Sequence, residues 1–322
     1  MKAVVLHEPG GPDVLKVENV PMPAAVPGKV LIRVKAFGLN RHDMFARQGL
    51  LPDVRFPIVL GLEAVGIVES APGGEFAVGA TVATAMGGMG HAFDGGYAEY
   101  TLVPADHVRS VVTNLPWETL GALPEMLQTA WGSLYEALQL KEGESLLVRG
   151  GTTSVGLAAT ALASRRGVTV YATTRNAGRR QLLLDSGATD VFVDNGRIAP
   201  EVKARTNGGV DKVLELVGVT TLDDSLQCVK TGGIVCKTGI VDGRFSMQGF
   251  LPESSIPTAV YLTAYLGDPQ FMTMPLQQLV DDVAAGALSV TIGKVFHIDE
   301  IVEAHRLMDS NMAGGKIVVL TG

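Results

Sequence analysis

The sequence predicts an α/β fold in which a doubly wound parallel sheet is inserted into a partly open β-barrel domain. From residue 145 onward, short apolar strands alternate with helical segments, as a parallel sheet covered on both faces requires. Residues 1–110 instead contain short strands separated by Pro and Gly turns, a pattern typical of a barrel. A chain of 322 residues is long enough for two such domains.

The elements follow from residue patterning in chain order. Barrel strands are expected at 30–34, 64–68 and 97–103, and a helix over 123–138 opens the second domain. Strands and helices of the parallel sheet then alternate at 145–149, 155–166, 168–173, 179–186, 191–193, 212–216 and 234–237. Helices at 276–285 and 300–310 and a strand at 316–320 are expected to return to the barrel. The predicted domains are therefore 1–122 with 256–322, and 123–255.

Composition excludes several classes of protein. Apolar residues make up 47% of the chain and charged residues 18%, which suits a large buried core. The net charge of -7 argues against binding to nucleic acid or to an anionic membrane. No apolar stretch resembles a signal sequence or a membrane span, so a cytoplasmic protein is expected. The two cysteines, Cys228 and Cys236, allow neither a disulfide framework nor a cysteine cage for zinc.

A glycine-rich turn between a predicted strand and helix is the best chemical signal in the chain. Gly151 and Gly156 match the first and third glycines of the G-x-G-x-x-G pattern, and Thr153 stands in the middle. Such a turn lets the backbone approach a pyrophosphate, while the helix N-terminus offers unpaired N–H groups. A dinucleotide site is therefore predicted at Gly151, Thr152, Thr153, Ser154, Val155 and Gly156. The alternative is a structural strand–helix turn in a sheet that binds something else.

The residues after the second parallel strand indicate which dinucleotide binds. NAD-binding proteins usually have an acidic residue there, whereas this chain has Thr174 and Arg175. Arg175, helped by Arg179 or Arg180, can hold a 2′-phosphate through charge-assisted hydrogen bonds, so the cofactor predicted is NADPH. Alternatively, these arginines only solvate the start of a helix. Two later strand ends are predicted to line the nicotinamide ribose, unless they are ordinary turns: Val217, Gly218, Thr238, Gly239 and Ile240.

Over nearly its full length the chain resembles the quinone oxidoreductase branch of the medium-chain dehydrogenase/reductase superfamily. The motifs that carry the resemblance are GLNRHD at 38–43, GLEAVGIV at 61–68, DGGYAEY at 94–100, the turn at 151–156 and GKIVVL at 315–320. The resemblance implies a Rossmann sheet, a GroES-like barrel and hydride transfer to a quinone or an α,β-unsaturated carbonyl. It also implies a homodimer, for which the exposed apolar sheet edge at 259–266 is the candidate surface.

The resemblance also bears on metal. Zinc-dependent members have a cysteine in the Asn40 position, a histidine in the Leu62 position and a further cysteine near Glu125, so no bound metal is expected here. His42, Asp43 and Glu63 remain, but three polar residues do not rebuild such a site. Glu63 and Asp43 could form an acid–base pair, although a buried structural role is favoured. A zinc-dependent alcohol dehydrogenase is kept as an alternative.

The remaining candidate residues come from the same resemblance. It places Asn40 beside the substrate and nicotinamide, and Thr129 near the nicotinamide ring; the alternatives are an Asn40 helix cap and a Thr129 bond to its own backbone. Phe45 and Leu51 stand where some relatives have tyrosines, so the proton would come from water or from His42. The alternative for His42 is a surface or capping role, which is more common for a lone histidine near a turn. Asn40 and His42 are therefore the catalytic candidates. A redox-sensing or structural protein that binds NADPH without turnover is the second hypothesis.

Overall fold

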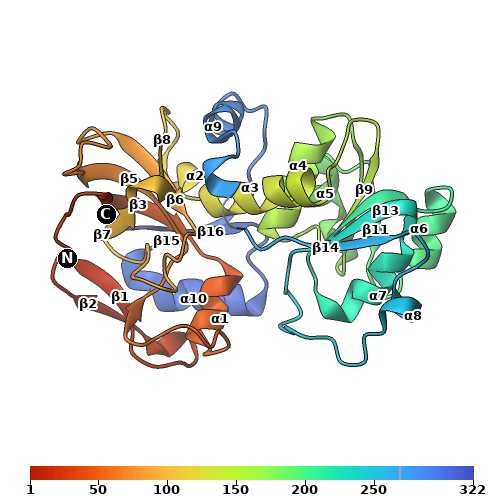
Figure 1. The fold of residues 1–322 in the computed structure, drawn as a ribbon, viewed down its shortest axis with the longest axis horizontal. Helices are drawn as coiled ribbons and strands as arrows, with labels where there is room; N and C mark the ends of the chain where they lie inside the picture. The colour runs from red at the N-terminus through yellow and green to blue at the C-terminus, as the bar shows by residue number, and fades with distance from the viewer. Residues whose placement is uncertain (268–269) are drawn as a thin grey trace. The chain divides into compact units, whose positions relative to one another are not determined.

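The computed structural model describes residues 1–267 and 270–322 and consists of two compact units. Unit 1 contains Met1–Glu125 and Gly267–Gly322, and unit 2 contains Met126–Leu266 (Figure 1). The sequence placed the return to the first domain at 256, but the structure places it at 267. The reason is that β14 (Tyr261–Ala264) pairs in parallel with β13 (Val229–Lys237) and so extends the sheet of unit 2.

Unit 1 is mainly antiparallel β structure. Its larger sheet has the strand order β15-β16-β3-β5-β6-β8, with β7 paired to β3, and its smaller sheet has the order β2-β1-β4. The elements are β1 (Lys2–Leu6), β2 (Leu15–Asn19), β3 (Lys29–Gly38), α1 (Arg41–Arg47), β4 (Ile58–Val59), β5 (Glu63–Ser70), β6 (Thr81–Ala85), β7 (Tyr100–Pro104), β8 (Val108–Ser110), α2 (Trp117–Leu120), α9 (Leu276–Ala284), β15 (Ile292–His297), α10 (Ile301–Ser310) and β16 (Lys316–Leu320).

Unit 2 is a parallel sheet with helices in its crossovers. All six strands pair in parallel in the order β11-β10-β9-β12-β13-β14. The elements, besides β13 and β14, are the end of α3 (Pro124–Trp131), β9 (Ser145–Arg149), α4 (Ser154–Ser164), β10 (Thr169–Thr174), α5 (Arg180–Asp185), β11 (Asp190–Val193), α6 (Ala199–Arg205), β12 (Val210–Glu215), α7 (Val219–Gln227) and α8 (Pro252–Ser255). The predicted fold class is confirmed.

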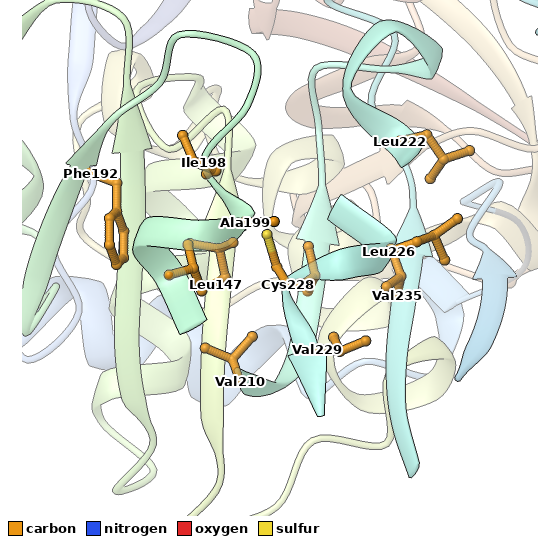
Figure 2. Close-up of a cluster of buried hydrophobic side chains, with 12 residues drawn as sticks. Leu147, Phe192, Ile198, Ala199, Val210, Leu222, Leu226, Cys228, Val229 and Val235 are labelled. Atoms are coloured by element: carbon orange, nitrogen blue, oxygen red, sulfur yellow. The ribbon is translucent and has the colours of Figure 1, made fainter. Parts of the chain in front are cut away.

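Each face of this sheet has its own apolar core. One cluster joins strand residues such as Leu147 and Val213 to helices α6 and α7, and Figure 2 shows its side chains. The other joins Ala172 and Val191 to helices α4 and α5. Adjacent residues Val191 and Phe192 of β11 belong to opposite clusters, because successive side chains of a strand point to opposite faces. Helices on both faces explain why strands such as β9 are apolar in their middle, at residues 146–148.

The first helix of unit 2 differs from its prediction. The sequence predicts one helix over 123–138, whereas α3 ends at Trp131 and residues Gly132–Ala137 form a π-helical stretch. A Cβ atom on Gly132 would lie 2.1 Å from the ring of Tyr265. The tyrosine therefore packs where a side chain would otherwise stand, and its hydroxyl donates to the Gln128 carbonyl at 3.3 Å.

Among the described residues, no helix is long and apolar enough to cross a membrane.

Candidate functional site

The glycine-rich turn lies between β9 and α4, as predicted from the sequence. Gly150 has a φ of +85°, a conformation that glycine adopts without steric cost. Thr153, which stands in the place of the middle glycine, is the N-cap of α4. Its hydroxyl accepts from the Gly156 amide at 3.0 Å and donates to the Gly150 carbonyl at 2.9 Å. The threonine side chain therefore closes the turn by hydrogen bonds, which a glycine could not do.

Gly156 keeps the helix close to the turn. A Cβ atom there would lie 2.6 Å from the Gly150 carbonyl oxygen and 2.7 Å from that of Gly151. The amides of Ser154 and Val155, the first two residues of α4, find no acceptor within the described chain. Together with half-buried Thr152, these groups form the open N-terminus of a helix, which suits an anion such as a pyrophosphate.

Two arginines follow β10 beside the turn. Thr174 is buried, Arg175 is exposed and Arg179 is half-buried. Neither Arg175 nor Arg179 has an ion-pair partner within residues 1–267 and 270–322. Arg180 differs, because its guanidinium bonds Asp190 at 2.6 Å and the Val191 carbonyl at 2.7 Å. The two unpaired arginines are therefore the ones available to an incoming phosphate.

The ends of β12 and β13 bring together the other residues predicted to face the cofactor. Val217 and Gly218 follow β12, and their amides donate to the Glu215 carboxylate at 2.7 and 3.0 Å. Thr238 and Gly239 follow β13 and donate to the Glu215 carbonyl at 3.0 and 3.1 Å. These residues and Ile240 thus lie at the carboxyl ends of neighbouring parallel strands, where ligands of doubly wound sheets bind.

Thr129 lies in α3, and the π-helical stretch that continues α3 contains Ser133, whose hydroxyl is 2.9 Å from that of Thr238. It is half-buried, and its hydroxyl accepts a hydrogen bond from the Gln128 amide at 3.3 Å.

A buried arginine, which the sequence analysis missed, joins the strand ends. Arg149 is the last residue of β9 and is fully buried. Its guanidinium makes a bidentate pair with Asp194, with both distances 2.9 Å, and bonds Asp224 at 2.7 Å. Burial lowers its pKa, but the neighbouring carboxylates outweigh this and raise the pKa above its usual value. Because Asp194 follows β11 and Asp224 lies in α7, the arginine links three elements beneath the turn.

Asn40 is at the centre of a polar cluster in unit 1. It occupies the N-cap position of α1, which was the alternative to its catalytic role, and its backbone amide donates to the Asp43 carboxylate at 2.9 Å. Its side-chain amide is bonded elsewhere as well: Oδ1 accepts from Lys316 Nζ at 2.6 Å, and Nδ2 donates to Glu63 at 3.0 Å. Glu63, Asp43 and Lys316 are all buried, which agrees with the structural role favoured for the two carboxylates.

His42 is poorly suited to be a proton donor. Burial, with a smaller effect from His91, lowers its pKa to about 4. The two imidazole rings meet edge to face, with centroids 5.5 Å apart. At neutral pH the ring of His42 is therefore uncharged, and an uncharged imidazole is a weak acid. Phe45 is buried and Leu51 is half-buried, so neither adds a proton donor.

Burial also raises the pKa of the Asp43 carboxyl group to about 7. The hydrogen bond from Asn40 and the charge of Lys316 act in the opposite direction and lower this pKa, but burial has the larger effect.

The parallel sheet with its glycine turn defines a dinucleotide-binding domain of the Rossmann class. Comparison with known proteins specifies the family. Residues 26–113 match the family described as "Alcohol dehydrogenase GroES-like domain", and residues 186–319 match the one described as "Zinc-binding dehydrogenase".

Three relatives cover almost the whole chain. A quinone oxidoreductase of Lama guanicoe is 30% identical over 99% of this chain and 97% of its own length. A 2-haloacrylate reductase of a Burkholderia species is 27% identical, with coverages of 99% and 98%. A mycobacterial structure complexed with NADPH superposes with a TM-score of 0.88 at 28% identity and covers both chains fully. The chain therefore belongs to the quinone oxidoreductase branch of the medium-chain dehydrogenase/reductase superfamily and is an oxidoreductase, which confirms the resemblance drawn from its motifs.

The residues around Asn40 do not fit a zinc ion. Leu62 offers no ligand, and the carboxylates of Glu63 and Glu125 face the Lys316 ammonium, with N···O distances of 2.7 and 3.5 Å. No group of three or more His, Cys, Asp or Glu side chains within the described residues could hold a metal ion. Zinc sites in proteins need several nitrogen, sulfur or carboxylate ligands. Here the carboxylates of Glu63 and Glu125 are already paired with the Lys316 ammonium.

Proposed function

We propose that this protein reduces a quinone or an α,β-unsaturated carbonyl compound with NADPH and without zinc. The observation that carries the proposal is the pair of unpaired arginines beside the glycine turn, in a chain whose relatives include quinone oxidoreductases and an NADPH complex. A conjugated acceptor suits a site without a metal, because conjugation spreads the charge that arrives with hydride.

NADPH would supply the hydride, which leaves its nicotinamide as the oxidised ring. The amides of Ser154 and Val155 would bind the pyrophosphate, and Arg175 with Arg179 would bind the 2′-phosphate. The loops after β12 and β13 would position the nicotinamide ribose, and Thr129 would lie near the nicotinamide ring. Asn40 would orient the acceptor carbonyl through its amide. The proton that completes the reduction would come from water, since His42 is uncharged at neutral pH.

A panel of acceptors tests this proposal. The purified protein, with its metal content measured, is mixed with NADPH and with quinones, enones and simple aldehydes, and cofactor absorbance is followed. Oxidation of NADPH by quinones or enones, at a rate unrelated to metal content, is expected. Activity that requires stoichiometric zinc would support the alcohol dehydrogenase alternative. NADPH binding without oxidation by any acceptor would favour the non-catalytic hypothesis, which the absence of tyrosines at positions 45 and 51 keeps open.

Arg175→Ala is expected to weaken NADPH binding about tenfold and to leave NADH binding unchanged. The arginine is exposed, so water screens its pairing, and the lower end of the range for charge-assisted hydrogen bonds applies. Titration of cofactor fluorescence measures both dissociation constants. Arg180→Ala is the matched control, because that guanidinium is already bonded to Asp190. Equal losses for NADPH and NADH would refute the assignment of the 2′-phosphate.

We also propose that the protein is a cytoplasmic homodimer. β14 is an edge strand; Tyr261, its first residue, is 61% exposed, and Leu266, just after it, is 88% exposed. An exposed apolar edge can pair with its own copy. Sedimentation velocity of the wild type and of Tyr261→Lys tests the dimer, and a monomeric wild type would exclude it.

The two free, buried cysteines support a reducing compartment, which fractionation of the source cells would test.

A further inference from the structure

We infer that Lys316 is a positioning residue that holds the Asn40 amide in one orientation. The inference rests on the proposed function, because Asn40 is the residue proposed to contact the acceptor.

The ammonium of Lys316 has three hydrogen-bonding directions and three partners. Nζ lies 2.6 Å from Asn40 Oδ1, 2.7 Å from Glu63 Oε1 and 3.5 Å from Glu125 Oε2. The side chains of Lys316 and Glu63 are 1% and 0% exposed, so water does not compete for these contacts. The neighbouring carboxylates offset the effect of burial and raise the pKa of Lys316, which keeps the ammonium charged.

This arrangement permits only one orientation of the Asn40 amide. Oδ1 faces the ammonium, so Nδ2 faces Glu63 at 3.0 Å and the Gly38 carbonyl at 3.4 Å. A flip of the amide would place its NH2 group against the ammonium and its oxygen against the carboxylate. Both contacts would then be repulsive. The hydrogen bond from Nδ2 to the Gly38 carbonyl is long. The N–H group that makes this bond is therefore the one that Asn40 can donate to an acceptor carbonyl.

The fold brings the lysine to this place. β16 runs antiparallel to β3, with Val318 opposite Gly38, so Lys316 lies beside the end of β3, next to Asn40, the N-cap of α1. A Cβ atom on Gly38 would lie 2.3 Å from Lys316 Cε and 2.4 Å from Glu63 Oε1. The absence of a side chain at position 38 therefore makes the space in which the lysine reaches Glu63 and Asn40.

Lys316→Met tests the inference, because methionine is similar in length and has no charge. The expected result is a fall in kcat/KM for the acceptor of about 10- to 100-fold, the range of one charge-assisted hydrogen bond, with the Kd of NADPH unchanged. Lys294→Met is the matched control, since it removes an exposed lysine from the adjacent strand β15. Should the unbalanced carboxylates impair folding, the charge-matched variant Lys316→Met with Glu63→Gln is measured in its place. Wild-type kcat/KM in an acceptor-active protein would overturn the inference and leave the proposed function standing.

A second measurement separates positioning from a general structural role. In the Asn40→Ala background, Lys316→Met is expected to change kcat/KM less than about twofold, because the lysine acts through an amide that is no longer there. An equal loss in both backgrounds would instead mean that Lys316 only supports the fold.

Selective 15N labelling of asparagine gives a readout that needs no activity. The side-chain amide protons of Asn40, identified by their loss in Asn40→Ala, are expected to exchange slowly with water in the wild type. They are expected to exchange at least about tenfold faster in Lys316→Met, since a hydrogen bond to a buried charge is lost. If the wild type reduces no acceptor, the proposed function fails, and this experiment still decides on the lysine. Equal exchange rates in the two proteins would overturn the inference.

Discussion

Arg149→Met is expected to lower the free energy of unfolding by about 3–5 kcal/mol, the range for breaking a buried ion pair by removing one partner. The guanidinium is fully buried and bonded to Asp194 and Asp224. Methionine would leave these carboxylates, with Glu215 nearby, to repel one another in a medium that hydrates them poorly. Because the arginine directly precedes Gly150, the glycine turn and the loop after β12 would lose their common support.

Urea unfolding measures the effect, and titration with NADPH measures its consequence for the turn. Arg180→Met is the control, since that arginine is 48% exposed and its pair with Asp190 contributes at most about 1 kcal/mol. A loss in Arg149→Met no greater than in Arg180→Met would show that the buried network does not hold the strand ends together.

Gly156→Ala is expected to weaken NADPH binding about 100-fold. The added methyl group would lie 2.6–2.8 Å from three backbone atoms of Gly150 and Gly151, and backbone cannot move aside as a flexible side chain can. Overpacking of this kind costs about 1–3 kcal/mol, and the strain falls on the turn that presents its amides to the pyrophosphate.

Calorimetric titration of folded Gly156→Ala with NADPH checks this result. Gly11→Ala is the control, because a Cβ atom there meets nothing within 4 Å and the backbone is extended, with a φ of -69°. Unchanged NADPH affinity in Gly156→Ala would place the dinucleotide away from this turn.

Local patterns sufficed to predict much of the molecule. Apolar strands that alternate with helices indicated a sheet covered on both faces, and the two core clusters on opposite sides of β11 are the physical counterpart of that pattern. The glycine turn was equally visible, since strand, turn and helix are consecutive in the chain. Thr153 looked like a departure from the fingerprint, but its hydroxyl closes the turn that the pattern requires.

Two charged residues could not be interpreted correctly in this way. Arg149 reads as the polar end of an apolar strand, and Lys316 reads only as part of a terminal family motif. A charge at a strand end is ordinarily exposed, and nothing nearby in the sequence indicates burial. The one signal available in the sequence was position: Arg149 directly precedes the glycine turn, and Lys316 lies within the family motif at 315–320.

By itself the sequence determined the fold class, the place of the glycine turn and the two arginines that follow the second parallel strand. These depend on residues close together in the chain, whose backbone preferences and periodicity act locally. Only the tertiary structure decided the partners of Arg149 and Lys316, the return of the chain at residue 267 and the neutral state of His42. Those features arise from residues tens to hundreds of positions apart, because burial and charge pairing depend on which segments the fold brings into contact.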